Sequence, residues 1–425
     1  MILFLVFVAA LLLLYHTKGN SIILYLPVTI FLAEVLFPLV YGPSSEITSS
    51  QIKVIFFTFL FSIFIFLRII YNGRYILTVY VITPFLFLVI AYLNSSVLWD
   101  GIKQVIRISV PLLAFPAYYI YFKRNGGLEK YLKNIMLFAL LFILLIAVSS
   151  ILQVGTYWSY GEKRIGGIYF FGVNLWELYS LSYAAMFLYF LKDKYKLNKM
   201  AIEVLFFAIL VILLLIYKRG LLIPMGLTLV FYYYYNFKRL NALKIFAGIV
   251  AAYIFLAPFV GQILASINER KDTLQLSSYA EEGRTKELAV YFDYYWGTLG
   301  FFESMIGQDF FNSGGKFQVM QDTLVDEERI LHSDLANLLY TTGILGTLAF
   351  YSYLVAIYLK FLRYKRGIDP LLRYLFYAFF ISLILKQMVE GLNMSLNYFI
   401  PLSIMGALFG VFEREKQLAA EQDTN

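Results

Sequence analysis

The sequence contains no cysteine, and its 425 residues include only two histidines, His16 and His332. The absence of cysteine excludes disulfides, thiolate metal sites and a cysteine nucleophile. A metal centre built on two histidines would need both, and they lie far apart in the sequence, in unlike surroundings. Charged residues are scarce as well, at 15% against about 25% in a soluble domain. We therefore expect no bound metal and no cofactor.

Apolar residues are abundant, because 61% of the chain is hydrophobic and 19% is aromatic. This excess needs a lipid solvent, and a helix needs about 20 apolar residues to cross a bilayer. We predict an all-α, polytopic membrane bundle of about 12–13 transmembrane helices that forms a single domain over residues 1–425. The predicted spans are 2–16, 21–41, 52–71, 75–93, 105–122, 134–154, 168–191, 201–217, 220–236, 243–265, 335–359, 371–389 and 395–412.

Basic residues mark alternate connections between these spans, from Lys18 and Arg74 near the start to Arg414 and Lys416 near the end. Cytoplasmic loops of membrane proteins carry the excess of lysine and arginine, so we assign this set to the cytoplasm. The C-terminus is then cytoplasmic, and the N-terminus is outside if the short first span crosses. The net charge of +8 thus reflects topology, and no nucleic-acid partner is expected.

The opposite side should be poor in arginine, yet it carries Arg164, Arg219 and Arg284 together with His332. It also holds the longest insert, 266–333, which we predict to be a partly helical periplasmic loop. Apolar residues at helical spacing predict one amphipathic helix from about Glu281. The glycine-rich stretch SMIGQDFFNSGGKF after it is predicted to be a turn.

His332 opens the string HSDLANLLYTTGILG. Ser333 or Asp334 can cap the helix that follows, and the positive end of that helix favours an anion such as phosphate. The same position keeps the imidazole near neutrality, as a base requires. Gly343 and Gly346 would permit close packing on one helix face. The alternative is a capping histidine with no chemistry.

Each outer arginine has a plain explanation when taken alone. Arg164 and Arg219 can extend to the interface from a helix end, and Arg284 can pair with a neighbouring glutamate. Arginine is also the preferred bidentate partner for phosphate. Three arginines and a histidine on one side therefore indicate an anionic ligand. The span-associated Glu34, Glu177, Glu203 and Glu390 are better explained as polar helix contacts than as an ion pathway.

The string from His332 to Gly346 resembles the H-[NSQ]-x9-G-x-x-G signature of the O-antigen ligase and Wzy-type polymerase superfamily. RIGGIYFFGVN resembles that family's R-x-x-G…N segment, through Arg164, Gly167 and Asn174. YKRG resembles its S-R-G turn at Arg219, although Tyr217 and Lys218 depart from the usual serine. EGRTKELAVYFDYYWGTLGFFESMIGQ resembles its G-R-x-x-x-W…G-x-G segment at Arg284, with Leu288, Gln308 and Asp309 departing from it. The matches cover about 164–346.

The resemblance implies a GT-C-type fold in the bacterial inner membrane and an inverting, metal-independent glycosyltransferase facing the periplasm. Donor and acceptor would be glycans on undecaprenyl pyrophosphate, with membrane lipids and a chain-length regulator as further partners. His332 would be the general base, and Arg219 and Arg284 would bind the pyrophosphate. Arg164 would help to hold the lipid-linked phosphate or glycan, with Asn174 and Asp334 as secondary candidates.

Two activities share this signature, because a polymerase extends a lipid-linked glycan and a ligase transfers the finished glycan to lipid A–core. The acidic residues in DEERILHSD and the high content of tyrosine and phenylalanine favour the polymerase. A transporter of lipid-linked glycans is the alternative from another class. It predicts a polar pathway through the bundle and no dependence on one outward histidine.

Overall fold

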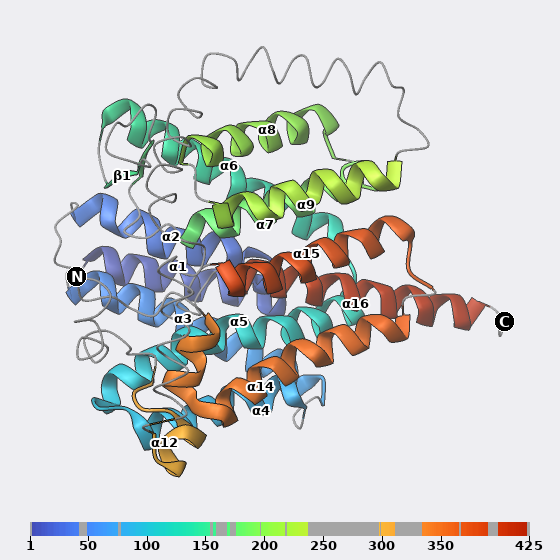
Figure 1. Ribbon diagram of the computed structural model, residues 1–425. Helices are drawn as coiled ribbons and strands as arrows, with labels where there is room; N and C mark the ends of the chain where they lie inside the picture. Colours follow the sequence, from blue (N-terminus) through green and yellow to red (C-terminus); the bar gives the residue numbers. More distant parts are fainter. Residues whose placement is uncertain are drawn as a thin grey trace, which may run out of the picture.

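The computed structural model is a bundle of long helices that run along a common direction (Figure 1). It describes residues 2–41, 49–74, 78–153, 156–158, 168–170, 176–195, 197–216, 219–236, 297, 299–310, 334–364, 367–389 and 398–422. The elements are α1 (Ile2–Lys18), the 3-10 helix η1 (Gly19–Tyr25), α2 (Leu26–Tyr41), α3 (Ser49–Asn72), α4 (Val79–Asn94), α5 (Leu98–Asn125), α6 (Leu128–Leu152), β1 (Thr156–Trp158), β2 (Ile168–Phe170), α7 (Trp176–Leu191), α8 (Lys199–Ile216), α9 (Arg219–Asn236), α12 (Phe301–Ile306), α14 (Asp334–Tyr364), α15 (Pro370–Val389) and α16 (Phe399–Gln422).

The predicted all-α membrane fold is confirmed. Five helical stretches are long and apolar enough to cross a membrane: Phe7–Ala33, Val54–Asn72, Leu98–Asn125, Leu128–Leu152 and Leu335–Tyr364. Leucines on the outer faces, such as Leu13 and Leu144, are more than half exposed, which in a bilayer is contact with lipid. The total of 12–13 spans stays a prediction.

The centre of the bundle is the pair α5 and α16. Along α5, every residue from Ile108 to Phe122 is buried. Gly406 and Gly410 lie one helical turn apart on α16, and their Cα atoms rest against the backbone of α5. A Cβ at these positions would lie 2.4 Å from the Phe115 carbonyl oxygen and 2.5 Å from that of Tyr119. This is the small-residue packing that lets membrane helices approach closely.

One end of the bundle collects the basic loops, and we call it the lysine end after Lys123, Lys192 and Lys360. Contacts between loops far apart in sequence define it. Arg124 donates to the Asn72 carbonyl at 2.6 Å, and Arg414 donates to the Arg124 carbonyl at 3.1 Å. Lys194 pairs with Asp369 at 3.2 Å. The C-terminus lies at this end and the N-terminus at the other (Figure 1).

One sequence-based prediction of local structure was wrong, and another was wrong only over its first residues. The helix expected from 168 begins only at Trp176, and Ile168–Phe170 instead pairs antiparallel with Thr156–Trp158, with Tyr157 opposite Tyr169. β-branched and aromatic residues there suit an extended chain. The stretch SMIGQDFFNSGGKF, expected to be a turn, begins with the last three residues of helix α12, and its described residues turn only from Gly307 on. The predicted span 243–265 and the amphipathic helix from Glu281 lie outside the described residues.

Candidate functional site

Two segments singled out by the sequence begin helices at the end of the bundle opposite the lysine end. Arg219 is the first residue of α9, and Tyr232 of the same helix donates to Asp193 at the lysine end. Asp334 is the first residue of α14, whose Lys360 pairs with the lysine-end Glu413 at 3.6 Å. Both helices therefore begin at the end of the bundle away from the lysine end (Figure 1). The other candidates, His332, Arg164, Arg284 and Asn174, lie outside the described residues.

Helix α14 breaks nine residues after Asp334, at Gly343, where φ is 63° and ψ is −166°. This backbone conformation is essentially restricted to glycine. The prediction that Gly343 and Gly346 share one face of a regular helix is therefore wrong, because the helix is not continuous there. The break lets another segment reach the backbone: a Cβ on Gly343 would lie 2.4 Å from the Met305 carbonyl.

Gly307 lies on the other side of this contact from Gly343. It follows α12 with φ of 84°, and a Cβ there would lie 2.5 Å from the Thr341 carbonyl carbon. The backbone N–H of Gln308 donates to the carbonyl of Tyr340 at 2.8 Å, and this carbonyl lies near the break. The end of α12 thus sits backbone to backbone in the kink of α14.

The end of α4 completes this junction through hydrogen bonds. The Asn94 amide nitrogen donates to the Ile306 carbonyl at 2.5 Å and to the Thr341 carbonyl at 2.9 Å. Asp309, which is 1% exposed, accepts from the backbone and hydroxyl of Ser96 at 3.0 and 2.9 Å. Three segments far apart in sequence are therefore fixed together, and we call this the α4–α12–α14 junction.

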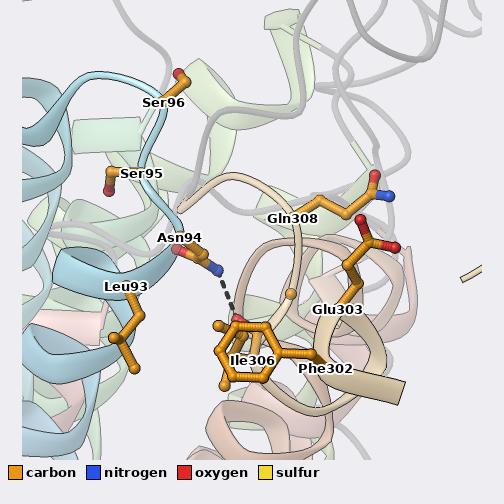
Figure 2. Close-up of a pocket in the computed structure, with 9 residues that line it drawn as sticks. Leu93, Asn94, Ser95, Ser96, Phe302, Glu303, Ile306 and Gln308 are labelled. Atoms are coloured by element: carbon orange, nitrogen blue, oxygen red, sulfur yellow. Dashed lines mark hydrogen bonds between the residues drawn. The ribbon is translucent and has the colours of Figure 1, made fainter. Parts of the chain in front are cut away.

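A pocket of about 480 Å³ lies beside the junction (Figure 2). Asn94, Ser95 and Ser96 lie on one side of it, and Glu303 and Gln308 lie on the other. Its remaining lining is formed by Leu93, Phe302, Ile306 and Gly307. Pockets for small ligands occupy about 300–1,000 Å³, so this one is large enough for a small molecule.

The strongest charge cluster belongs to the lysine end. Glu413 is 9% exposed and pairs with Lys123 at 2.9 Å, while Tyr119 and Tyr364 donate to it. Burial by itself would raise the pKa of Glu413, but these hydrogen bonds outweigh burial and lower the pKa to about 2. The carboxylate therefore stays ionised and joins α5, α14 and α16.

A second pair at this end accounts for Glu203, one of the four glutamates noted in the sequence. It accepts from Lys192 at 2.6 Å, and Lys192 lies over the Tyr189 ring. The interpretation of Glu203 as a polar helix contact is confirmed. Among the residues that the structure describes, no group of three or more acidic or histidine side chains could hold a metal ion.

Sequence reasoning missed the junction and its pocket. Asn94, Ser95 and Ser96 form a polar interruption between two apolar runs, and that interruption was the available signal. Asp309 was noted only as a departure from a family pattern, whereas the structure gives it a buried role as an acceptor. Nothing in the sequence indicates which helix break these residues would meet.

Comparison of the chain with protein-family models and with curated proteins gave no match. The family suggested by the His332–Gly346 string therefore remains a resemblance.

Proposed function

We propose that the chain is a membrane glycosyltransferase that polymerises undecaprenyl-pyrophosphate-linked repeat units into O-antigen or a related surface polysaccharide at the periplasmic face. The observation that carries the proposal is the common placement of two motif segments. Arg219 and Asp334 are 115 positions apart in sequence, and both begin helices at the end away from the lysine end. If the lysine end is cytoplasmic, that end faces the periplasm.

The proposed chemistry needs one general base and a binding site for the two phosphates of the leaving group. The acceptor hydroxyl attacks the anomeric carbon of the donor from the face opposite the pyrophosphate. Its proton passes to the His332 imidazole as the carbon–oxygen bond to phosphate breaks. Undecaprenyl pyrophosphate leaves with the electron pair, and Arg219 and Arg284 balance its charge. Arg164 holds the lipid-linked phosphate or glycan.

Helix N-termini support this assignment physically. Only one residue separates His332 from Asp334, so covalent geometry alone keeps their Cα atoms within about 8 Å. The first backbone N–H groups of α14 and α9 have no partner within their own helices, and both helices begin at the end where the pyrophosphate would lie. Such donors stabilise developing negative charge without a metal ion.

Transfer of lipid-linked glycan in proteoliposomes tests the proposal, with His332→Ala as the decisive variant. Loss of a general base should slow transfer by about 10²–10⁴-fold. His16→Ala is the matched control, because His16 is the second histidine and lies exposed on α1. Full activity of His332→Ala would rule out the base and, with it, this mechanism.

The arginine clamp has its own test. Arg219→Lys and Arg284→Lys should each reduce transfer, since lysine cannot make the bidentate contact with phosphate. Arg68→Lys, on the exposed face of α3, is the control. Undiminished transfer by both variants would remove the clamp.

A deletion strain separates the related activities. Lipopolysaccharide capped with a single repeat unit indicates the polymerase. Unmodified core together with glycan accumulating on its lipid carrier indicates the ligase instead. Activity that tolerates His332→Ala but depends on polar residues inside the bundle indicates a transporter.

A further inference from the structure

The pocket at the α4–α12–α14 junction has an unusual lining for a chain so rich in apolar residues. Five of its nine residues carry polar side chains, namely Asn94, Ser95, Ser96, Glu303 and Gln308. Among the residues that the structure describes, neither lysine nor arginine lines it. A phosphate or another anion would therefore meet one carboxylate and no cation, so the pocket does not suit the anionic part of a lipid carrier.

Two polar atoms at the pocket are buried and have no hydrogen-bond partner. They are the Asn94 amide oxygen and the Ser95 hydroxyl oxygen. The Asn94 amide nitrogen is already used by the carbonyls of Ile306 and Thr341, which fixes the orientation of its oxygen. Both atoms are enclosed by protein, and the Ser95 hydroxyl lies over Gly101, where a Cβ would be 2.0 Å from its oxygen, so neither atom is offered to a ligand in the pocket.

The accessible polar lining fits a ligand with hydroxyl groups. Amides offer both a donor and an acceptor, and a carboxylate offers acceptors, which together match hydroxyl groups that donate and accept. Figure 2 shows the polar ends of Gln308 and Glu303 close together on the side of the pocket away from Asn94, with the ring of Phe302 below them in this view. An aromatic face packs well against the C–H groups on one face of a sugar ring.

We propose that this pocket is a subsite for a neutral sugar ring, with Glu303 and Gln308 binding its hydroxyl groups and Phe302 packing on its apolar face. The subsite lies near Tyr340, six residues into α14, which is about 9 Å along the helix from Asp334. Under the proposed function the reacting ring lies beside the start of α14, so the bound ring would be another ring of the glycan. That the sugar belongs to the glycan substrate rests on the proposed function, whereas binding of the ring does not.

Remote binding of this kind would hold the glycan in register while another of its rings reacts. Binding energy from a part of the substrate that does not react can be used to orient the part that does. The subsite would therefore contribute to the choice of glycan rather than to the chemical step.

The lack of cysteine permits a direct test on the full-length protein. Leu93→Cys and Ser96→Cys each place one thiol at the wall of the pocket and leave Glu303 and Gln308 intact, and Phe301→Cys places one outside it on α12, where Phe301 is 83% exposed. The measurement is the rate of maleimide labelling with and without glucose, galactose, mannose, rhamnose or N-acetylglucosamine. Inorganic phosphate is the comparison probe.

At least one sugar should slow labelling in the pocket, by about sixfold when its concentration is about five times its Kd, with no effect at position 301. The proposal is overturned if no sugar protects either pocket thiol, if protection is equal at position 301, or if phosphate protects as well as the sugars do. The assay requires no turnover. A His332→Ala background that loses transfer but keeps protection separates this subsite from the proposed reaction.

Discussion

Replacement of Gly343 by alanine should release α12 from the kink of α14. The φ and ψ angles at this position cost a residue with a Cβ about 1–3 kcal/mol. The new methyl would also lie 2.4 Å from the Met305 carbonyl, and overpacking of this kind costs about 1–3 kcal/mol more. The two effects together predict a loss of about 2–6 kcal/mol at the junction.

Hydrogen exchange at the backbone N–H of Gln308 measures this loss directly, because that N–H donates to the Tyr340 carbonyl across the contact. A loss of even 2 kcal/mol should speed exchange of the 301–310 peptide about thirtyfold, at 1.4 kcal/mol for each factor of ten. Gly226→Ala is the control, since a Cβ there meets nothing within 4 Å. If exchange in Gly343→Ala equals that in the wild type, the kink does not depend on glycine and the reasoning fails.

Three further changes have defined outcomes. Asp309→Ala should lower the thermal midpoint in detergent more than Ser96→Ala, because it removes two hydrogen bonds to a carboxylate, each worth about 1.5–3 kcal/mol, whereas Ser96→Ala removes one. The pKa of Glu413 is lower in the folded chain than its ordinary value of 4.5. Ionised Glu413 should therefore stabilise the fold by about 3 kcal/mol above pH 4.5, and this stabilisation should be lost as the pH falls toward 2. Glu413→Gln should abolish this pH dependence in acid-unfolding curves. Breaking a fully buried ion pair costs about 3–5 kcal/mol, and Glu203→Ala should cost less because Glu203 is half exposed. Adding Lys192→Met to this variant should restore part of the lost stability in the same melting assay.

Hydrophobic patterning predicted the helices because a bilayer requires long apolar runs, and Val54–Asn72 and Leu128–Leu152 show that requirement plainly. Patterning failed at Ile168–Phe170, since three apolar residues suit a strand as well as a helix. It also failed at Gly343. A glycine in an apolar run commonly marks close helix packing, and only the approach of Met305 and Gly307 shows that the helix breaks there.

The predictions for the candidate site also fall into those that the structure describes and those that it does not. The predictions for His332 and Arg284 rest on short strings and stay predictions, while Arg219 and Asp334 occupy helix starts, as a role near an anion would require. The pocket could not be predicted, because its walls come from 93–96 and 302–308 and its position depends on a carbonyl of α14. No local pattern relates segments more than two hundred residues apart.

The contact between Gly307 and Gly343 has a consequence for how this sequence can change over time. Each glycine is required by the backbone of the segment that carries the other, so the first substitution at either position meets the full steric cost. The two positions should therefore covary among descendants of this sequence, remaining glycine together or being replaced together. A lineage that lost one glycine would have to rebuild the whole approach of α12 to α14.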